Sequence, residues 1–257
     1  MTTVLLAAFL ACVADAGPDT AVRLIAHRGG VVDAQHAEDT LASLQEAIRQ
    51  GYWMVEVDVR RSKDGELVVQ HDENFKRIYG VNKKVGDLDW SEILQLRSRI
   101  DGQPPCTFAQ YAAQCRGKIR VMIDSKERGP QDGFFEKMEE ILRANDLLKD
   151  GLFIGSGESK THFKGKARIA TDRKGLQRAV AAGEDVASLY FLFEHGTTLD
   201  DDAVKHAQSI KVPVVASVND FHYITKPNSK PQSDIERLKR AGVTLFQIDS
   251  AYSEFCK

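Results

Sequence analysis

From Arg23 to the C-terminus, short runs rich in Val, Ile and Leu alternate with longer amphipathic stretches. This alternation is typical of repeated βα units, in which parallel strands are covered by helices. No low-complexity linker or change in composition interrupts it, which indicates one domain. Nine runs have the character of strands, at residues 23–26, 54–59, 66–70, 119–123, 152–155, 168–170, 189–193, 212–218 and 244–248.

The second and third runs are joined only by the tight turn Lys63-Asp64-Gly65. Parallel strands need a crossover of a dozen or more residues, so these two runs form an antiparallel hairpin. Eight parallel strands remain, with helices expected between them at residues such as 41–50, 133–144, 200–210 and 234–241. We therefore predict an α/β fold, a (β/α)8 TIM barrel with a small antiparallel hairpin extension after the second strand. The active site of such a barrel lies at the C-terminal ends of its strands.

The N-terminal residues stand apart from this pattern. Residues 4–13 are apolar and precede Ala14-Asp15-Ala16, which has the small-x-small form of a signal-peptidase site. We expect residues 1–16 to be a signal peptide and residues 17–257 to be the barrel domain of a secreted or periplasmic protein. Lipidation at Cys12 is the alternative to cleavage after Ala16. No later stretch approaches the roughly twenty apolar residues of a membrane span, so no integral membrane association is expected.

The charge and the cysteine content of the chain bear on its binding partners and on disulfide formation. The chain has 35 Lys and Arg against 37 Asp and Glu, and no long basic run. Nucleic-acid binding relies on a basic surface, so no nucleic-acid partner is expected and a small-molecule substrate is favoured. The oligomeric state stays open. Cys106 and Cys115 flank a predicted helix at residues 107–114, which separates them beyond the reach of a disulfide.

Candidate catalytic groups follow the first two strands. His27-Arg28-Gly29-Gly30 stands at the end of the first. In Val55-Glu56-Val57-Asp58-Val59 on the second, polar and apolar residues alternate. Both carboxylates therefore project into the barrel, while the valines face the helices. Burying two acids in a barrel interior is costly unless a cation neutralises them.

The hairpin brings a second histidine toward the same place. Asp58 and His71 lie at similar distances in sequence from the centre of the turn, which makes them near cross-strand neighbours. The next parallel strand ends in Asp124-Ser125-Lys126, which adds a third carboxylate and a lysine on one face. Three carboxylates without a thiolate suit one divalent cation, Ca²⁺ or Mg²⁺, better than Zn²⁺.

Together these groups predict chemistry on a phosphodiester. Glu56, Asp58 and Asp124 would hold a cation that polarises a phosphoryl oxygen. Arg28 and Lys126 would bind the remaining phosphate charge. His27 and His71 would serve as general acid and general base, and the residues do not say which is which.

The same residues resemble the glycerophosphodiester phosphodiesterase family. The shared motifs are His27-Arg28-Gly29, Glu38-Asp39-Thr40, Glu56-x-Asp58-Val59, Lys63-Asp64-Gly65, His71-Asp72 with Arg77, Asp124-x-Lys126, Val218-Asn219 and Ile248-Asp249. The resemblance covers nearly the whole chain after residue 16. It implies a metal-dependent phosphoric diester hydrolase that converts glycerophosphodiesters to glycerol 3-phosphate and an alcohol. It also implies Glu38 and Asn219 as substrate-binding residues beside Arg28 and Lys126.

Several positions depart from the family pattern. Asp124 stands where the family usually has Glu, which leaves the identity of the metal open. Asp39 stands where Asn is common, and both residue types cap helices well. Ala216 stands where the family tends to have Trp, and we expect its small side chain to remove an aromatic wall from the substrate side of the barrel. Strand-end position makes Phe193 and Phe221 candidate lining residues.

Two alternative functions stay open. A phospholipase-type phosphodiesterase of the same fold also uses two histidines, but it releases a cyclic phosphate through attack by an internal hydroxyl or acts on lysophospholipids. A non-catalytic binding protein that kept the barrel is the second alternative. Retention of both histidines, the paired acids, Arg28 and Lys126 argues against the second.

Overall fold

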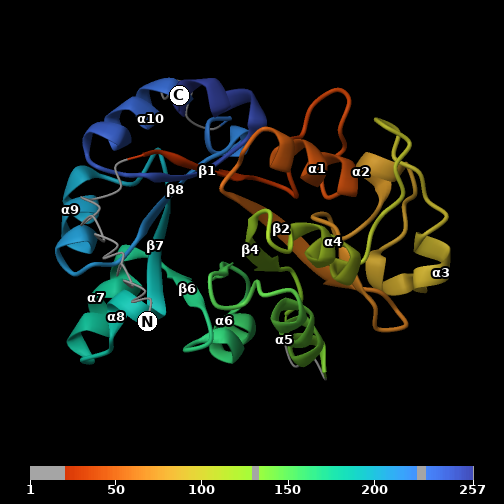
Figure 1. The fold of residues 1–257 in the computed structure, drawn as a ribbon, viewed down its shortest axis with the longest axis horizontal. Coiled ribbons are helices and arrows are strands. Elements are labelled where there is room, and N and C mark those ends of the chain that lie inside the picture. Colours follow the sequence, from red (N-terminus) through yellow and green to blue (C-terminus); the bar gives the residue numbers. More distant parts are fainter. Residues whose placement is uncertain (1–20, 129–132, 225–229, 257) are drawn as a thin grey trace, which may run out of the picture.

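The computed structural model describes residues 21–128, 133–224 and 230–256, so the expected signal peptide at residues 1–16 lies outside the described residues. Eight parallel strands close into a barrel because the last pairs with the first (Figure 1). This confirms the predicted (β/α)8 fold. In order around the barrel the strands are β1 (Arg23–Ala26), β2 (Met54–Arg61), β4 (Arg120–Ser125), β5 (Leu152–Phe153), β6 (Arg168–Thr171), β7 (Tyr190–His195), β8 (Val214–Val218) and β9 (Leu245–Ile248).

Helices surround the barrel (Figure 1). They are α1 (Leu41–Arg49), α2 (Lys76–Tyr79), α3 (Trp90–Ile93), α4 (Phe108–Cys115), α5 (Phe134–Ala144), α6 (Gly157–Phe163), α7 (Arg173–Ala181), α8 (Val186–Leu189), α9 (Asp201–Ser209) and α10 (Pro231–Arg240). The helix expected at residues 234–241 begins three residues earlier, at Pro231. Proline suits a first helical position because its fixed φ is already helical and the missing N–H would have no partner there. No helix in the described part of the chain is long and apolar enough to cross a membrane.

The predicted hairpin is formed by β2 and β3 (Leu67–Val69), which pair antiparallel with Val59 opposite Val69. The pairing of β2 with β4 ends at Val59, so the last two residues of β2 leave the barrel together with β3. The backbone N–H of Gln70 donates to the Asp58 carbonyl at 3.0 Å. Gln70 is therefore the residue opposite Asp58, and His71 lies one residue further along.

The core has an inner and an outer layer, which follow from the two-residue period of the strands. The inner cluster takes one side chain from each barrel strand: Ile25, Met54, Met122, Leu152, Ala170, Phe191, Val215 and the partly buried Leu245. The outer cluster lies between barrel and helices and contains Val55, Val57 and Val59. Each such valine contributes roughly 1.5–3 kcal/mol by leaving water.

Ala216 also belongs to the outer cluster, where it pairs in register with Phe246. The expectation that this residue faces the substrate is therefore wrong. Its neighbour Ser217 occupies the inward position and donates a hydrogen bond to Gln247 Oε1 at 2.8 Å.

A third cluster lies beside the hairpin, where α2 and α3 extend from one side of the barrel (Figure 1). Its buried members include Val68 of β3, Phe75, Tyr79 and Ile93. The two faces of β3 thus serve different cores, because Leu67 and Val69 belong to the outer cluster of the barrel. The cysteines Cys106, Cys115 and Cys256 are free and buried, so no disulfide joins Cys106 to Cys115, as predicted.

Candidate active site

A polar layer lies directly above the inner apolar cluster, at the C-terminal ends of the strands. Two residues beyond Ile25, Met54 and Met122 the strands carry His27, Glu56 and Asp124. A further step along β2 gives Asp58. The alternation read from the sequence therefore brings these four side chains to one mouth of the barrel.

The three predicted metal ligands form a compact cluster. Glu56, Asp58 and Asp124 each offer an oxygen, and these atoms lie within 4.8 Å of one another. The Lys126 Nζ lies 2.7 Å from Asp58 Oδ1 and 2.5 Å from Asp124 Oδ2. Burial disfavours the charge of Lys126, but the carboxylates of Asp58 and Asp124 outweigh that effect and raise its pKa, which keeps the ammonium charged.

One ammonium does not balance three carboxylates. Glu56 and Asp58 are each 1% exposed, and Asp58 Oδ2 has no hydrogen-bond partner among the described residues. Burial, followed by the charge of Asp58, raises the pKa of Glu56 well above its usual value. Buried, under-compensated carboxylate oxygens are the donor set that hard divalent cations prefer, so these residues fit Ca²⁺ or Mg²⁺.

His27 lies at the end of β1 and is almost completely buried. Its Nδ1 lies 2.6 Å from Asp249 Oδ1, and its Nε2 lies 4.0 Å from Glu56 Oε2. Burial opposes the ionisation of Asp249, but the hydrogen bond with His27 outweighs it and lowers its pKa. An ionised Asp249 fixes the ring of His27 and directs Nε2 toward the acidic cluster.

His71 follows β3 and is more exposed than His27. Its Nδ1 lies 2.8 Å from Asp72 Oδ1, and the other oxygen of Asp72 accepts a hydrogen bond from Arg77 Nε at 2.8 Å. Burial acts against the ionised form of Asp72, yet the hydrogen bonds of Arg77 and His71 lower its pKa to about 2. Each histidine at the mouth thus has its own carboxylate partner.

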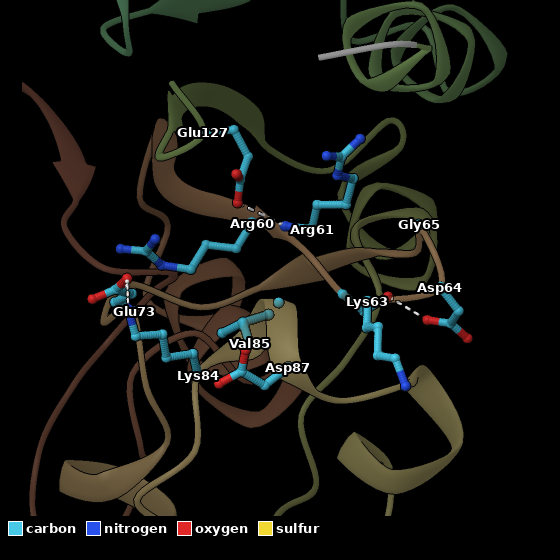
Figure 2. A pocket seen from close by; sticks show the side chains of 12 residues that line it. Arg60, Arg61, Lys63, Asp64, Gly65, Glu73, Lys84, Val85, Asp87 and Glu127 are labelled. Atoms are coloured by element: carbon cyan, nitrogen blue, oxygen red, sulfur yellow. Dashed lines mark hydrogen bonds and ion pairs between the residues drawn. The ribbon is translucent and has the colours of Figure 1, made fainter. Parts of the chain in front are cut away.

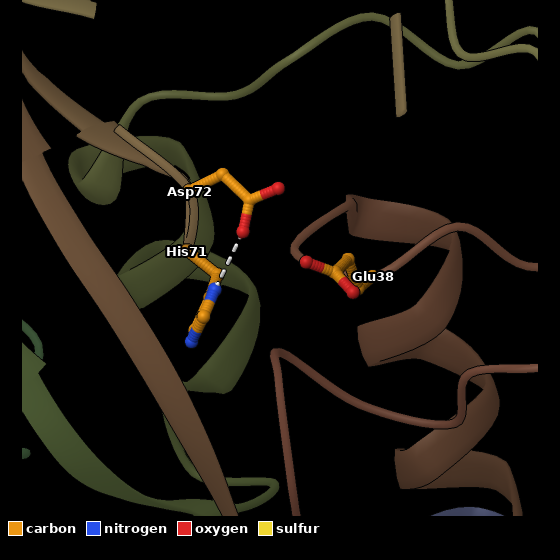
Figure 3. Close-up of side chains that lie close together, drawn as sticks. All are labelled: Glu38, His71 and Asp72. Atoms are coloured by element: carbon orange, nitrogen blue, oxygen red, sulfur yellow. Dashed lines mark hydrogen bonds and ion pairs between the residues drawn. The ribbon is translucent and has the colours of Figure 1, made fainter. Parts of the chain in front are cut away.

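Glu38 connects the second histidine to Arg28. Its two oxygens accept hydrogen bonds from Arg77 at 2.6 and 2.7 Å, and one also accepts from Arg28 Nη1 at 3.1 Å. Figure 3 shows the Glu38 side chain opposite those of His71 and Asp72. These three residues are as compact as a metal site. Because guanidinium groups already occupy both Glu38 oxygens, Glu38 orients Arg28 instead of offering a free ligand.

The backbone at Arg28 and Gly29 brings this loop against the barrel. Arg28 has a positive φ of 53°, and its N–H donates to Glu56 Oε2 at 2.8 Å. A Cβ atom on Gly29 would lie 2.7 Å from the Asp39 Cα, so no other residue fits there without displacement. Gly29 therefore serves close packing on Asp39 before α1, and Gly30 serves close packing on the backbone of Ser43 within α1.

Asp39 does not cap α1, contrary to the role expected from its sequence position. Thr40 is the cap, and its side chain accepts from the Ser43 N–H at 3.2 Å. Asp39 has a φ of 56°, is 1% exposed, and neither carboxylate oxygen has a hydrogen-bond partner among the described residues.

Asn219, predicted to bind substrate, lies at the end of β8 and is buried. Its side-chain amide donates to Ser217 Oγ at 2.9 Å and to Gln247 Oε1 at 3.2 Å. Its Oδ1 has no partner in the described part of the chain. The amide thus belongs to a polar network inside the barrel mouth, and a contact with substrate stays a prediction.

The two sides of the mouth differ in character. A charged groove of about 1260 Å³ runs from Lys126 past Glu127, Lys160 and Asp172, with Phe193 in its wall. An apolar cleft of about 320 Å³ lies on the other side, next to His27 and Arg28, and is lined by Val32, Phe221, Ile224 and Ala251. Phe221 and Ile224 are 50% and 79% exposed.

Two further histidines meet near this cleft. His195 of β7 and His222 stack with their ring centroids 3.6 Å apart, and Phe221 lies 4.0 Å from His222. His222 is buried, and burial followed by the charges of His195 and His27 lowers its pKa to about 4. It is therefore a neutral, buried residue.

Sequence reasoning missed the role of Asp249 as the partner of His27 and of Arg77 as the partner of Glu38 and Asp72. Asp249 directly follows β9, and β9 pairs with β1 only when the barrel closes. In a closed barrel the last strand pairs with the first strand, so the residue that follows the last strand lies beside the residue that follows the first strand. The closure of an eight-stranded barrel therefore predicts that Asp249 lies near His27.

Comparison with known proteins gives a consistent result. The model of the glycerophosphoryl diester phosphodiesterase family matches residues 27–247. A lysophospholipase D of Homo sapiens is 39% identical over 94 residues, which are 37% of this chain and 28% of that protein. A second human lysophospholipase D is 32% identical over 182 residues, which are 68% of this chain and 56% of that protein. The chain therefore spans less than two thirds of either relative.

Solved structures share the barrel. A putative glycerophosphodiester phosphodiesterase from Galdieria sulphuraria is 15% identical, with a TM-score of 0.73 over 91% of this chain and 97% of that chain. A phosphodiesterase from Oleispira antarctica, solved in complex with the product sn-glycerol-3-phosphate, is 21% identical, with a TM-score of 0.67 over 89% of this chain and 93% of that chain. At these identities the likeness shows the fold.

Proposed function

Because the chain belongs to the glycerophosphoryl diester phosphodiesterase family, we propose that it is a divalent-cation-dependent hydrolase that converts glycerophosphodiesters to glycerol 3-phosphate and an alcohol. The observation that carries the proposal is the under-compensated Glu56, Asp58 and Asp124 cluster with His27 beside it. His27 and the second histidine, His71, each have a carboxylate partner. The product bound to the Oleispira antarctica phosphodiesterase supports glycerol 3-phosphate as the product to assay.

The chain's own residues would divide the work as follows. Glu56, Asp58 and Asp124 would hold the cation, which supplies Lewis-acid polarisation of a phosphoryl oxygen. Arg28, oriented by Glu38, would bind a second phosphate oxygen through its guanidinium. Lys126 balances part of the carboxylate charge and contributes a further positive group at the mouth.

The two histidines would transfer protons. One imidazole would take a proton from the attacking water, and the other would give a proton to the departing alcohol oxygen. The carboxylates of Asp249 and Asp72 bind Nδ1 of His27 and His71, respectively, which leaves Nε2 of each ring for this exchange. Both carboxylates also stabilise the protonated ring that forms during the reaction.

The test is release of glycerol 3-phosphate from glycerophosphocholine and glycerophosphoethanolamine in the presence of EDTA, Ca²⁺ or Mg²⁺. We expect product only with a cation, and we expect His27→Ala and His71→Ala each to lower kcat by about 10²- to 10⁴-fold, the usual contribution of general acid–base catalysis. A cyclic phosphate as the product would favour the phospholipase-type reaction. No cleavage with either cation would favour a binding protein.

The apolar cleft supports a second candidate substrate class, lysophospholipids. It borders His27 and Arg28, and its exposed Phe221 and Ile224 offer apolar surface at the point where an acyl-glycerol group would extend from the phosphate. Two relatives of the chain are lysophospholipases D. A higher kcat/KM for lysophosphatidylcholine than for glycerophosphocholine, lost on Phe221→Ser, would place this class first.

A further inference from the structure

The guanidinium of Arg60, a residue outside the predicted site, binds the backbone of His71. Its Nε and Nη2 both donate to the backbone carbonyl oxygen of His71, at 3.0 and 2.7 Å. Arg60 lies two residues beyond Asp58 on β2, in the part of the strand that has left the barrel and pairs only with β3. Its side chain therefore reaches from the hairpin back to the residue that carries the second histidine.

His71 has few other constraints on its backbone. The last backbone hydrogen bond between β2 and the segment that follows β3 runs from the Gln70 N–H to the Asp58 carbonyl, one residue before His71. Among the described residues, His71 makes no hydrogen bond to another backbone group. Asp72 holds the ring through Nδ1, but Asp72 is the next residue in the chain and would move with His71.

We infer that Arg60 is a positioning residue that fixes the main chain at His71, so that the imidazole keeps its place relative to the barrel. The inference rests on the proposed function, in which His71 transfers a proton. Two donors from one planar guanidinium restrain both the position and the direction of the carbonyl, and a single ammonium cannot do this. A displacement of about 1 Å in a catalytic group can cost about 100-fold in rate.

A direct contact with substrate is the competing role for Arg60. The residue lines the charged groove and also a second, hairpin groove of about 600 Å³ next to Arg61, Lys63 and Lys84. Figure 2 shows Arg60 and Arg61 leaving β2 in different directions. A substrate contact would act on KM, whereas a positioning role acts on kcat.

Arg61 provides the matched control. It is the next residue on β2 and lines the same hairpin groove. Its backbone N–H donates to Glu127 Oε1 at 3.0 Å, but its guanidinium makes no hydrogen bond or ion pair with a described residue. Arg60→Met and Arg61→Met therefore remove the same charge and the same hydrogen-bonding groups, and only the first removes the hold on His71.

The first measurement is steady-state hydrolysis by the unmodified protein, Arg60→Met, Arg60→Lys and Arg61→Met. We expect Arg60→Met to lower kcat by about 10- to 100-fold with KM changed less than about twofold. Arg60→Lys should recover part of the loss, and Arg61→Met should resemble the unmodified protein. A rise in KM at constant kcat, or an equal loss in Arg61→Met, would overturn the inference.

The second measurement does not require activity. The imidazole signals of His71, assigned by their disappearance in His71→Gln, are followed by NMR in the three arginine variants. We expect them to shift and broaden in Arg60→Met and to stay in place in Arg61→Met, while unchanged signals in Arg60→Met would overturn the inference. If the unmodified protein cleaves no diester, the proposed function fails, and these spectra still decide whether Arg60 positions His71.

Discussion

Two acidic clusters of similar compactness lie at the barrel mouth, and they differ in how their charge is compensated. The hairpin cluster, Glu38 with His71 and Asp72, receives hydrogen bonds from the guanidinium groups of Arg28 and Arg77. In the described part of the chain, Lys126 is the one lysine or arginine that ion-pairs with the barrel cluster, Glu56 with Asp58 and Asp124. Close spacing of acidic side chains is therefore not enough to identify a cation site. The acids must also lack compensating positive charge from the protein.

The pKa values of Asp72 and Glu56 show the same difference in charge compensation between the two clusters. Burial acts against ionisation in both. In the hairpin cluster the bonds of Arg77 and His71 outweigh burial and lower the pKa of Asp72 to about 2. In the barrel cluster the neighbouring charge of Asp58 adds to burial, and the pKa of Glu56 is raised well above its usual value.

The sharpest test of this distinction is cation affinity. Asp58→Asn should weaken Ca²⁺ or Mg²⁺ binding by about 100-fold or more, because affinity for these ions depends on the number of charged ligands. Glu38→Gln should change it by less than about threefold, since arginines already occupy that carboxylate. Isothermal titration calorimetry measures both. Equal weakening in the two variants would show that the clusters act as one site.

A smaller effect, on stability, is expected when the hairpin cluster loses the positive charge of Arg77. Arg77→Met leaves the buried Glu38 carboxylate with only its bond to Arg28. Loss of partners for a buried charge should lower the free energy of unfolding by about 1–3 kcal/mol. Arg116→Met, which removes an exposed ion pair with Asp146, should change it by less than about 0.5 kcal/mol. Urea unfolding distinguishes the two, and similar values would contradict a structural role for Arg77.

The smallest effect concerns Asp39, a buried acid beside the barrel cluster. Burial, then the charges of Asp58 and Glu38, raise the pKa of Asp39 well above its ordinary 3.8. Folding therefore favours its protonated form, and its contribution to stability is lost as the pH rises above 3.8. Asp39→Asn should raise the free energy of unfolding by about 1 kcal/mol at pH 8 in EDTA, and by little at pH 4.

Asp33→Asn serves as the control for that measurement. Hydrogen bonds from Gln35 and His36 outweigh the slight burial of Asp33 and lower its pKa. Its contribution to stability is present above 3.8 and lost in acid, so the substitution should lower stability at pH 8 instead of raising it. Thermal unfolding at the two pH values measures both variants. The same sign for both would refute the assignment of Asp39.

Much of the fold was predictable because the relevant signals are local. Short apolar runs marked the strands, and the turn at residues 63–65 was too short for anything but a hairpin. The alternation around Glu56 and Asp58 placed both acids inside the barrel. These inferences need only the strand period and the length of a connection, and neither depends on distant residues.

The remainder depended on contacts between distant segments. Ala216 was expected to face the substrate, but the register of β8 against β9 turns it toward the helices. Asp39 was expected to act as a cap, but Thr40 takes that place, and Asp39 turns into the interior at a positive φ. The bond from Arg60 to the His71 carbonyl spans 11 residues and requires the hairpin to be folded. Hydrophobic periodicity contains no information about such side-chain bonds.

The hydrogen bond between His27 and Asp249 joins residues 222 positions apart, across the pairing of β1 with β9. During synthesis His27 leaves the ribosome early, whereas its carboxylate partner emerges only after the final barrel strand. A nascent chain that already contains the acidic cluster and both histidines still lacks the group that orients the first of them. The orientation of His27 is thus tied to completion of the last barrel strand, because a chain that ends before Asp249 lacks the carboxylate that binds Nδ1.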